Sequence, residues 1–309
     1  MKSLLVTAYV SPDLDGVAGA MAYAEFLNKT GIPARVAFFG ELHEEARYVL
    51  DRFGIAYPES ISDTNAFEQV ILVDASDLNG LEGKVPPEKV IEIYDHRKIH
   101  EADKFPNAKA QIELVGAAAT LIAEKFISQG IEISKESAIL VCGAILSNTL
   151  NFQAGVTTKR DHVAYAWLNE RAGLPEDFWK DLFEAKSDLS DEKLRERIVG
   201  DFAHFTLGGK HIGIAQIEMI GAGELVEKRE EEILSVLRDM VEEMSLDFVF
   251  QSTLELDGAK NYFVTEQDET KVLLKEIFAV EFQGSIAERS GLIMRKQIVP
   301  LLKDALERS

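Results

Sequence analysis

Carboxylates and one histidine follow three short apolar runs of the chain, and these residue types in this arrangement can hold a divalent metal. The first run leads into Ser11-Pro12-Asp13-Leu14-Asp15-Gly16, the second into Asp74, and the third into Asp95-His96-Arg97. The carboxyl ends of parallel strands meet at one edge of a sheet, so we expect these side chains to lie together. Several carboxylates with one imidazole suit Mn²⁺, Mg²⁺ or Co²⁺.

The spacing within this group favours a two-metal arrangement. Asp13 and Asp15 are two residues apart in a turn, so their side chains diverge, and each could bind a different ion of a pair. Asp74 would then be the central ligand, and His96 would supply the imidazole. An acidic residue after a strand is also a common helix cap, so a capping role for Asp13 or Asp15 stays open.

Alternating strands and helices position these residues in the first half of the chain. The strands are near-continuously apolar, which is typical of a parallel sheet covered on both faces, and the pattern predicts an α/β, doubly wound domain. Strands are expected over residues 3–8, 34–39, 70–73 and 90–93. Helices are expected over residues 16–27, 44–53 and 117–126, followed by a buried segment over 138–146.

A polar break at residues 187–191 follows two further helical patterns and predicts the domain boundary, with a first domain over 1–188 and a second over 189–309. The second domain is expected to be smaller, with a mixed α/β fold. Gly208-Gly209 lies between two strand patterns and predicts a hairpin. The remaining patterns predict a helix over 225–244, strands over 248–250 and 261–264, and a helix over 298–306.

Composition excludes several classes of function. The chain has 309 residues, is 46% hydrophobic and carries a formal charge of −20. That acidity argues against general nucleic-acid binding, because phosphate backbones are held by Lys and Arg. Cys142 is the single cysteine, and no stretch reaches about 18 consecutive apolar residues, so we expect a cytoplasmic protein with no membrane span.

At these residues the chain resembles the DHH phosphoesterase superfamily. The likeness is greatest to its branch of manganese-dependent (family II) inorganic pyrophosphatases and related exopolyphosphatases, including the prune-like proteins. Six segments carry the resemblance in the same order along nearly the whole chain: Pro12-Asp13-Leu14-Asp15, Val73-Asp74, Asp95-His96-Arg97, Leu114 to Thr120, Ile145 to Thr149, and Arg295 to Pro300.

The resemblance implies a role for each matching residue. Asp13, Asp15, Asp74 and His96 would be metal ligands, with Mn²⁺ as the metal. Arg295 and Lys296 of the second domain would bind the phosphate groups, with the active site in the cleft between the domains. The resemblance also makes a homodimer plausible.

Four departures from the family pattern bear on this site. Tyr9 stands where the pyrophosphatases usually have a histidine ligand, and Asn148 where they have an aspartate ligand. Arg97 replaces a second histidine, as in prune-like proteins. The usual lysine falls at Ala203, beside His204, which we include among the candidate substrate-binding residues.

These departures predict an asymmetric metal site. One position would keep Asp15, Asp74 and His96 and bind its ion tightly. The other would keep Asp13 and Asp74, with the Asn148 carbonyl or water, and bind weakly. Tyr9 is a poor ligand unless it is ionised, which its usual pKa of about 10 opposes.

The expected activity is hydrolysis of pyrophosphate or short polyphosphate. Metal at Asp13, Asp15, Asp74 and His96 would activate a water, and Arg97, Arg295, Lys296 and His204 would neutralise the small anionic substrate. Two alternatives stay open: a phosphodiesterase acting on short oligonucleotides or cyclic dinucleotides, and a binding or regulatory homologue with weakened turnover.

Overall fold

The computed structural model describes residues 4–78, 80–98, 100–186 and 193–307. Contacts between Cα atoms divide the chain into two compact units, Met1–Ala185 and Lys186–Ser309. The predicted boundary between residues 188 and 189 lies outside the described residues, so it stays a prediction. None of the helices in the described part of the chain has the length and apolar character needed to cross a bilayer.

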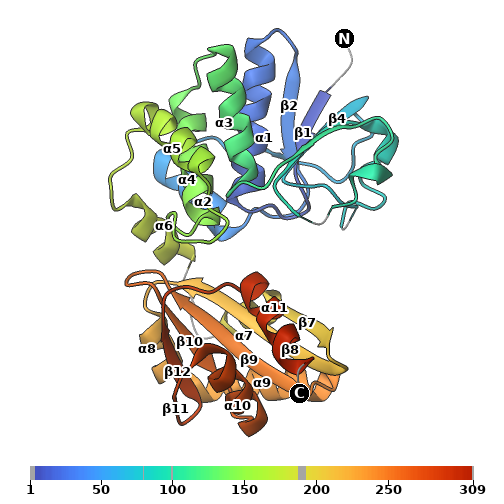
Figure 1. Cartoon of the computed structure of the whole chain (residues 1–309). Coiled ribbons are helices and arrows are strands. Elements are labelled where there is room, and N and C mark those ends of the chain that lie inside the picture. Colours follow the sequence, from blue (N-terminus) through green and yellow to red (C-terminus); the bar gives the residue numbers. More distant parts are fainter. Residues whose placement is uncertain (1–3, 79, 99, 187–192, 308–309) are drawn as a thin grey trace. The chain divides into compact units, whose positions relative to one another are not determined.

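The first unit alternates strands and helices (Figure 1). Its elements are β1 (Leu4–Thr7), α1 (Leu14–Lys29), β2 (Ala34–Phe38), α2 (Glu44–Phe53), β3 (Glu59–Ser60), β4 (Gln69–Val73), β5 (Val90–Asp95), β6 (Lys109–Ile112), α3 (Ala118–Gln129), α4 (Lys135–Asn148), α5 (Lys159–Ala172) and α6 (Phe178–Lys186). Two short 3₁₀ helices, Pro87–Lys89 and Ala102–Lys104, precede and follow β5.

The strands of this unit form one parallel sheet in the order β3-β2-β1-β4-β5-β6. The chain begins at the middle with β1, moves outward to β2 and β3, and then crosses to β4 on the other side of β1. The strand order therefore reverses between β1 and β4, and ligands of open α/β sheets bind at the carboxyl edge beside such a reversal. The predicted α/β class with a parallel sheet is confirmed.

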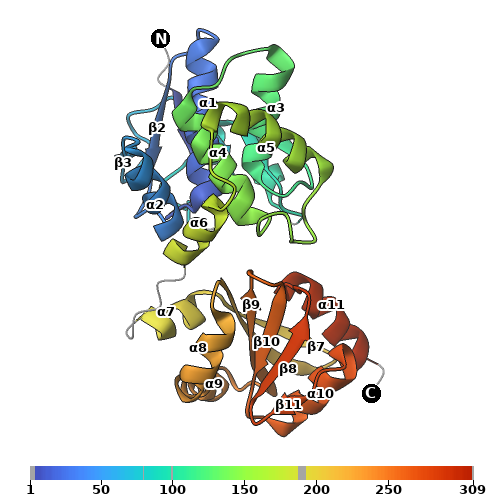
Figure 2. The same cartoon turned by 90° about the vertical axis from the view of Figure 1, so that its left-hand side faces the viewer.

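Alternate residues of the central strands enter two different cores, as a pleated strand requires. Leu4 and Val6 of β1 pack with the apolar residues of helices α1 to α6, whereas Leu5 faces a second core on the opposite side of the sheet. That second core is closed by Phe67, Phe105 and other residues of connecting segments. The helices therefore stand together on one face of the sheet (Figure 2).

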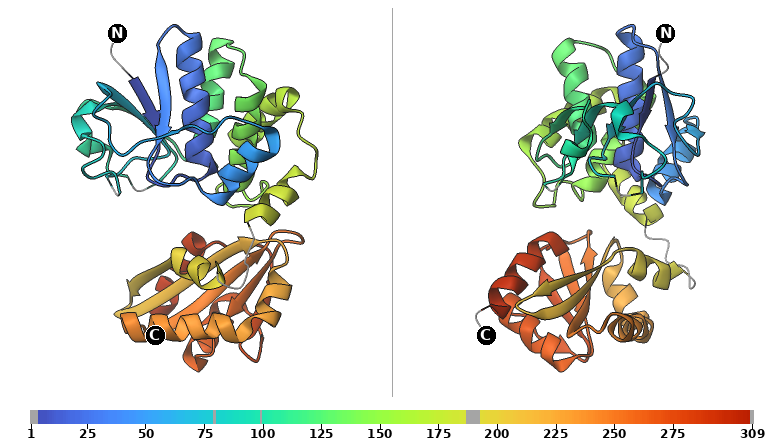
Figure 3. Two further views of the ribbon diagram at one scale, coloured as in Figure 1. Left: turned by 180° about the vertical axis from the view of Figure 1, so that it is seen from behind. Right: turned by 90° about the vertical axis from the view of Figure 1, so that its right-hand side faces the viewer.

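The second unit contains a mixed sheet in the order β11-β12-β10-β9-β8-β7, in which β8 and β9 are parallel and the other pairs antiparallel. Its elements are α7 (Lys193–Gly200), β7 (Phe202–Leu207), β8 (Lys210–Met219), α8 (Ala222–Lys228), α9 (Glu230–Met244), β9 (Phe248–Glu255), β10 (Lys260–Val264), α10 (Asp268–Phe278), β11 (Phe282–Gln283), β12 (Ile286–Ser290) and α11 (Arg295–Leu306). Helices α7, α8 and α9 cover one face, and α10 and α11 cover the other (Figure 3). The predicted hairpin is the β7–β8 pair.

The single helix predicted over residues 225–244 is wrong, because the structure divides it into α8 and α9 at Arg229. Arg229 leaves helical geometry, with φ −118° and ψ 26°, and its guanidinium pairs with Glu232 in the first turn of α9. The apolar residues on both sides of this break, including Leu225 and Ile233, enter the same core. The helical spacing of the apolar residues therefore continues through the break, so the sequence pattern does not reveal it.

Helix α1 approaches the sheet closely at Gly19, directly over the end of β4. A Cβ atom on Gly19 would lie 2.6 Å from Cγ1 of Val73, the residue before Asp74. The backbone of α1 can therefore lie this near to β4 only because residue 19 has no side chain. This contact fixes the depth of α1 at the sheet edge where the predicted site residues meet.

Gly19→Ala is expected to destabilise the protein by about 1 kcal/mol. Alanine gains about 1 kcal/mol of helix propensity, but overpacking against Val73 costs about 1–3 kcal/mol, so the clash prevails. Urea unfolding measures the difference. Gly200→Ala is the control, because no atom lies within 4 Å of a Cβ at that position. Equal stabilities for Gly19→Ala and the parent protein would contradict the close packing.

Candidate metal centre

Three strand ends deliver the predicted residues to the carboxyl edge of the parallel sheet. The segment after β1 carries Asp13 and Asp15, β4 is followed by Asp74, and β5 ends at Asp95, followed by His96. Because β1, β4 and β5 are neighbours in the sheet, these ends are adjacent. The acidic residues of the three strand ends, which are far apart in the sequence, therefore lie close together at one edge of the sheet, as the sequence predicts.

Asp13 is the N-cap of α1. Its Oδ1 accepts hydrogen bonds from the backbone N–H of Asp15 at 3.0 Å and of Gly16 at 3.1 Å. Its own backbone N–H donates to the Tyr9 hydroxyl at 2.9 Å. The capping role that the sequence left open for Asp13 is thus present, and it commits one carboxylate oxygen to the helix.

Asp15 lies in the first turn of α1 and its side chain has no exposed surface. Oδ1 accepts the N–H of Ala119 at 2.8 Å, and Oδ2 accepts the N–H of Ala118 at 2.7 Å. Both donors belong to the first turn of α3, whose positive helix end favours a carboxylate there. A third donor, Nδ2 of Asn148 at the end of α4, lies 2.7 Å from Oδ2.

Asp74 directly follows β4 and adopts a left-handed backbone conformation with φ 55°. Its backbone N–H still donates to the carbonyl of Tyr94 at 2.7 Å, so pairing between β4 and β5 continues to this residue. The carboxylate is buried, and its Oδ1 has no hydrogen-bond donor among the described residues. A buried carboxylate oxygen without a donor is costly, and a cation would satisfy it.

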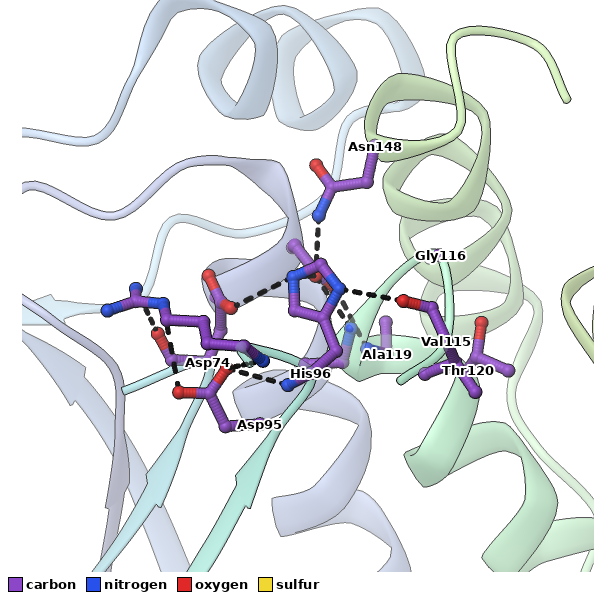
Figure 4. Close-up of polar contacts among 12 residues, drawn as sticks. Asp74, Asp95, His96, Val115, Gly116, Ala119, Thr120 and Asn148 are labelled. Atoms are coloured by element: carbon purple, nitrogen blue, oxygen red, sulfur yellow. Dashed lines mark hydrogen bonds and ion pairs between the residues drawn. The ribbon is translucent and has the colours of Figure 1, made fainter. Parts of the chain in front are cut away.

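His96 directs one ring nitrogen at these carboxylates (Figure 4). Nδ1 lies 3.0 Å from the carbonyl oxygen of Val115, which can only accept, so the Nδ1 hydrogen is donated there. Nε2 lies 3.5 Å from Oδ1 of Asp74 and 3.7 Å from Oδ2 of Asp15. This is the arrangement of a metal-binding histidine whose second nitrogen is held by a backbone carbonyl.

Asp15, Asp74 and His96 form a group that fits a divalent metal ion. Each offers one ligand atom, and the three atoms lie within 4.8 Å of one another. The unpaired Asp74 oxygen supports the same conclusion, as does a donor set of two carboxylates and one imidazole. These are the three residues of the tighter metal position predicted from the sequence.

Burial of these carboxylates changes their protonation. Burial raises the pKa of Asp15 to about 7, and although His96 opposes the rise, the negative charge of Asp13 adds to it. The pKa of Asp74 is raised well above its usual range by burial and then by the neighbouring charge of Asp15. Without a bound cation, the two carboxylates therefore retain protons at a pH where exposed carboxyls have lost them.

Asn148 and Tyr9 do not present ligand atoms to this group. The Asn148 amide nitrogen donates to Asp15, and its oxygen is turned away (Figure 4). The Tyr9 hydroxyl accepts the N–H of Asp13, and burial raises the pKa of the phenol, so it keeps its proton. The predicted use of the Asn148 carbonyl as a ligand is not the arrangement that this structure has.

Arg97 is engaged by Asp74 and by three neighbouring side chains. Nη2 donates to the Asp74 carbonyl oxygen at 2.9 Å, and Nη1 pairs with Oδ2 of Asp77 at 3.1 Å. Nε lies 3.7 Å from Oδ2 of Asp95, and the guanidinium carbon is 5.6 Å from the centre of the Tyr9 ring. The side chain is therefore held by groups of the protein itself.

Asp161 supports His96 through the backbone, a role that the sequence analysis missed. Both of its oxygens accept the N–H of Gly116, at 3.0 and 2.9 Å, and Gly116 follows the Val115 carbonyl that holds His96. Asp161 is fully buried and also accepts hydrogen bonds from Thr158 at the start of α5. The capping-box spacing of Thr158 and Asp161 was a signal for the helix start but not for this second contact.

Glu45 of α2 is a second supporting residue that the sequence analysis missed. Oε1 accepts the N–H of Leu14, and Oε2 accepts the hydroxyl of Ser147. The side chain is buried. Glu45 thus joins the start of α1, beside Asp15, to the end of α4, beside Asn148.

The predicted phosphate-binding residues belong to the second unit, and Arg295 is engaged within it. Its Nη2 pairs with Oδ1 of Asp201 at 2.6 Å, and Nη1 donates to the Asp201 carbonyl at the same distance and to that of Ile214 at 3.3 Å. Its backbone N–H donates to Gln216. Lys296 and His204 are exposed. Among the described residues Lys296 makes no hydrogen bond or close ion pair, although the negative charge of Glu218 acts on its ammonium.

The matches to known proteins agree with this architecture. Residues 180–305 match the family model of the DHHA2 domain. The manganese-dependent inorganic pyrophosphatases of Methanothrix thermoacetophila and Bacillus subtilis are each 31% identical to this chain, with 99% of both chains covered. A Methanococcus jannaschii crystal structure, provisionally assigned as a family II inorganic pyrophosphatase, superposes with a TM-score of 0.73 and 29% identity over 98% of this chain and 99% of its own.

A parallel sheet with an acidic metal group beside its strand reversal, followed by a DHHA2 unit, defines the class as DHH-family phosphoesterases. Within that class, the chain belongs to the manganese-dependent inorganic pyrophosphatase family. The resemblance predicted from the sequence motifs is confirmed.

Mn²⁺ is expected to raise the unfolding temperature more at about pH 8 than at about pH 6. The folded-state pKa of Asp15 is raised to about 7, so at the lower pH the ion must displace a proton that is already absent at the higher pH. Calorimetry with and without Mn²⁺ at both pH values measures the two shifts. Asp74→Asn, which removes one ligand charge, is expected to abolish most of the Mn²⁺-induced rise in unfolding temperature at both pH values. Equal shifts in the parent protein would contradict this linkage.

Proposed function

We propose that this protein hydrolyses inorganic pyrophosphate with Mn²⁺ held by Asp15, Asp74 and His96. The observation that carries the proposal is the buried Asp74 oxygen that lacks a donor and faces a histidine nitrogen, in a chain of this family. When bound, a divalent ion acts as a Lewis acid and lowers the pKa of a coordinated water, which supplies the nucleophile.

The residues of the chain prepare the centre for this chemistry. The first turn of α3 and Asn148 hold both oxygens of Asp15 in place, so little reorganisation is needed when the ion binds. The Val115 carbonyl fixes the ring of His96 with Nε2 toward the carboxylates. Burial keeps bulk water away from Asp15 and Asp74, which strengthens their interaction with a cation.

We further propose that Lys296 and His204 bind the phosphate groups of the substrate. An exposed lysine without an ion pair can give its charge to an incoming anion. Arg295, whose guanidinium is paired with Asp201, acts by fixing the start of α11, where Lys296 is the next residue. Cytoplasmic location and homodimer formation stay predictions.

Asp74→Asn is expected to lower the rate of Mn²⁺-dependent phosphate release from pyrophosphate by at least about 100-fold, because it removes a ligand charge while keeping the shape of the side chain. Phosphate release by the purified protein measures this. Asp177→Asn, at an exposed position of the same unit, is the control. Parent-level activity of Asp74→Asn would overturn the assignment.

Tripolyphosphate and a dinucleotide belong in the same assay, because they separate the proposed activity from its alternatives. Pyrophosphate is expected to be cleaved fastest. Faster cleavage of the dinucleotide would establish the phosphodiesterase alternative. Absence of both Mn²⁺ binding and turnover would favour the binding or regulatory alternative.

Lys296→Ala is expected to raise the KM for pyrophosphate about tenfold without changing the unfolding temperature, since one charged contact to an anion contributes about 1.5 kcal/mol. Arg295→Ala is the matched comparison. It is expected to lower the unfolding temperature, because the carbonyl oxygens of Asp201 and Ile214 and the Asp201 carboxylate lose their hydrogen-bond donor. Steady-state kinetics and thermal unfolding distinguish these two roles. An unchanged KM for Lys296→Ala would contradict the anion-binding proposal.

A further inference from the structure

We infer that this centre binds a single divalent ion, and that the Arg97 guanidinium supplies a second, permanent positive charge beside it. The inference rests on the proposed function, because it concerns the metal group at Asp15, Asp74 and His96. It differs from the two-ion arrangement that the spacing of Asp13 and Asp15 predicts. It also assigns to Arg97 a place in the metal centre instead of a contact with the substrate.

The ligand atoms of the centre provide for one ion. Among the described residues, a single group of three or more acidic, histidine or cysteine side chains converges in this way. Asp13 is outside that group, and its Oδ1 accepts two N–H bonds from the start of α1. A second ion would therefore depend on the remaining Asp13 oxygen, one shared Asp74 oxygen and water.

Asn148 supports the metal position at Asp15, Asp74 and His96 and contributes no ligand to a second position at Asp13. Its amide N–H donates to Oδ2 of Asp15, so it acts as a hydrogen-bond donor that holds a ligand in place. An amide nitrogen in this role has no lone pair to offer a cation. The neutral side chain also brings no negative charge to offset a second ion.

Arg97 lies beside Asp74 and carries a charge that does not titrate in proteins. It donates to the Asp74 carbonyl, pairs with Asp77 and lies within ion-pair distance of Asp95 Oδ2, a buried oxygen with no hydrogen bond among the described residues. The Tyr9 ring lies against its guanidinium. These contacts hold the guanidinium beside Asp74.

A fixed guanidinium beside Asp74 has two effects on the centre. It neutralises part of the acidic cluster that would otherwise attract another cation, and it repels any further cation that approaches Asp74. The centre then has one exchangeable ion and one built-in charge. Activation by Mn²⁺ should follow a simple saturation curve, with no sign of a second binding event.

Metal binding tests the inference directly. The purified full chain is dialysed against micromolar Mn²⁺, and the bound metal is counted by elemental analysis. Electron paramagnetic resonance of the loaded protein then reports whether Mn²⁺ ions are coupled to each other. A single ion per chain and an uncoupled signal are expected. Two ions per chain, or a coupled signal, would overturn the inference.

Variants of Arg97 test its part separately. Arg97→Gln is expected to bind a second Mn²⁺ ion, whereas Arg97→Lys keeps the charge and should remain at a single ion. Arg35→Gln removes an equal charge from an exposed position of the same unit and should also remain at a single ion. A single ion in Arg97→Gln, with its unfolding still cooperative, would overturn the role of Arg97.

Pyrophosphate hydrolysis measured on the same samples distinguishes this inference from the proposed function. A protein that binds a single Mn²⁺ ion but releases no phosphate would overturn the function and leave the metal count standing. A protein that binds two ions and hydrolyses pyrophosphate would overturn the metal count and leave the function standing.

Discussion

The fully buried carboxylate of Asp15 is the constraint on which the first unit depends. A charge removed from water must be compensated by protein donors or by a cation. Here the compensation comes from the N–H groups of Ala118 and Ala119 and from the amide N–H of Asn148. The starts of α1 and α3 and the end of α4 must therefore converge at one point of the sheet edge.

Much of the first unit follows from its sequence because apolar runs and helix periodicity are local signals. The helix of residues 44–53 was predicted at its observed bounds, and the strands β1, β2, β4 and β5 lie where the apolar runs are. Strand β6 was missed, because its side chains are exposed or half-buried and give no apolar run. Helix α10 was missed as well, and Arg229 interrupts a helix whose apolar spacing continues.

The metal group was predictable because strand ends place acidic residues at one edge regardless of the loops between them. The orientation of the supporting groups was not, because it depends on contacts between distant segments. Asp161 reaches Gly116 across 45 residues, and Asn148 meets Asp15 across 133. The partners of Arg97 could not be predicted either, since the sequence does not show which of several nearby carboxylates a guanidinium will pair with.

The division into two units, each with its own apolar cores, has an evolutionary consequence. Every residue of the metal group, with its supporting residues Glu45 and Asp161, lies in the first unit, whereas Lys296 and Arg295 lie in the second. Under the proposed function, mutations of the metal group and mutations of the proposed anion-binding residues therefore fall in units that are packed around separate cores. A lineage can change its preferred metal or its preferred phosphate compound one at a time, without having to rebuild the other half of the enzyme.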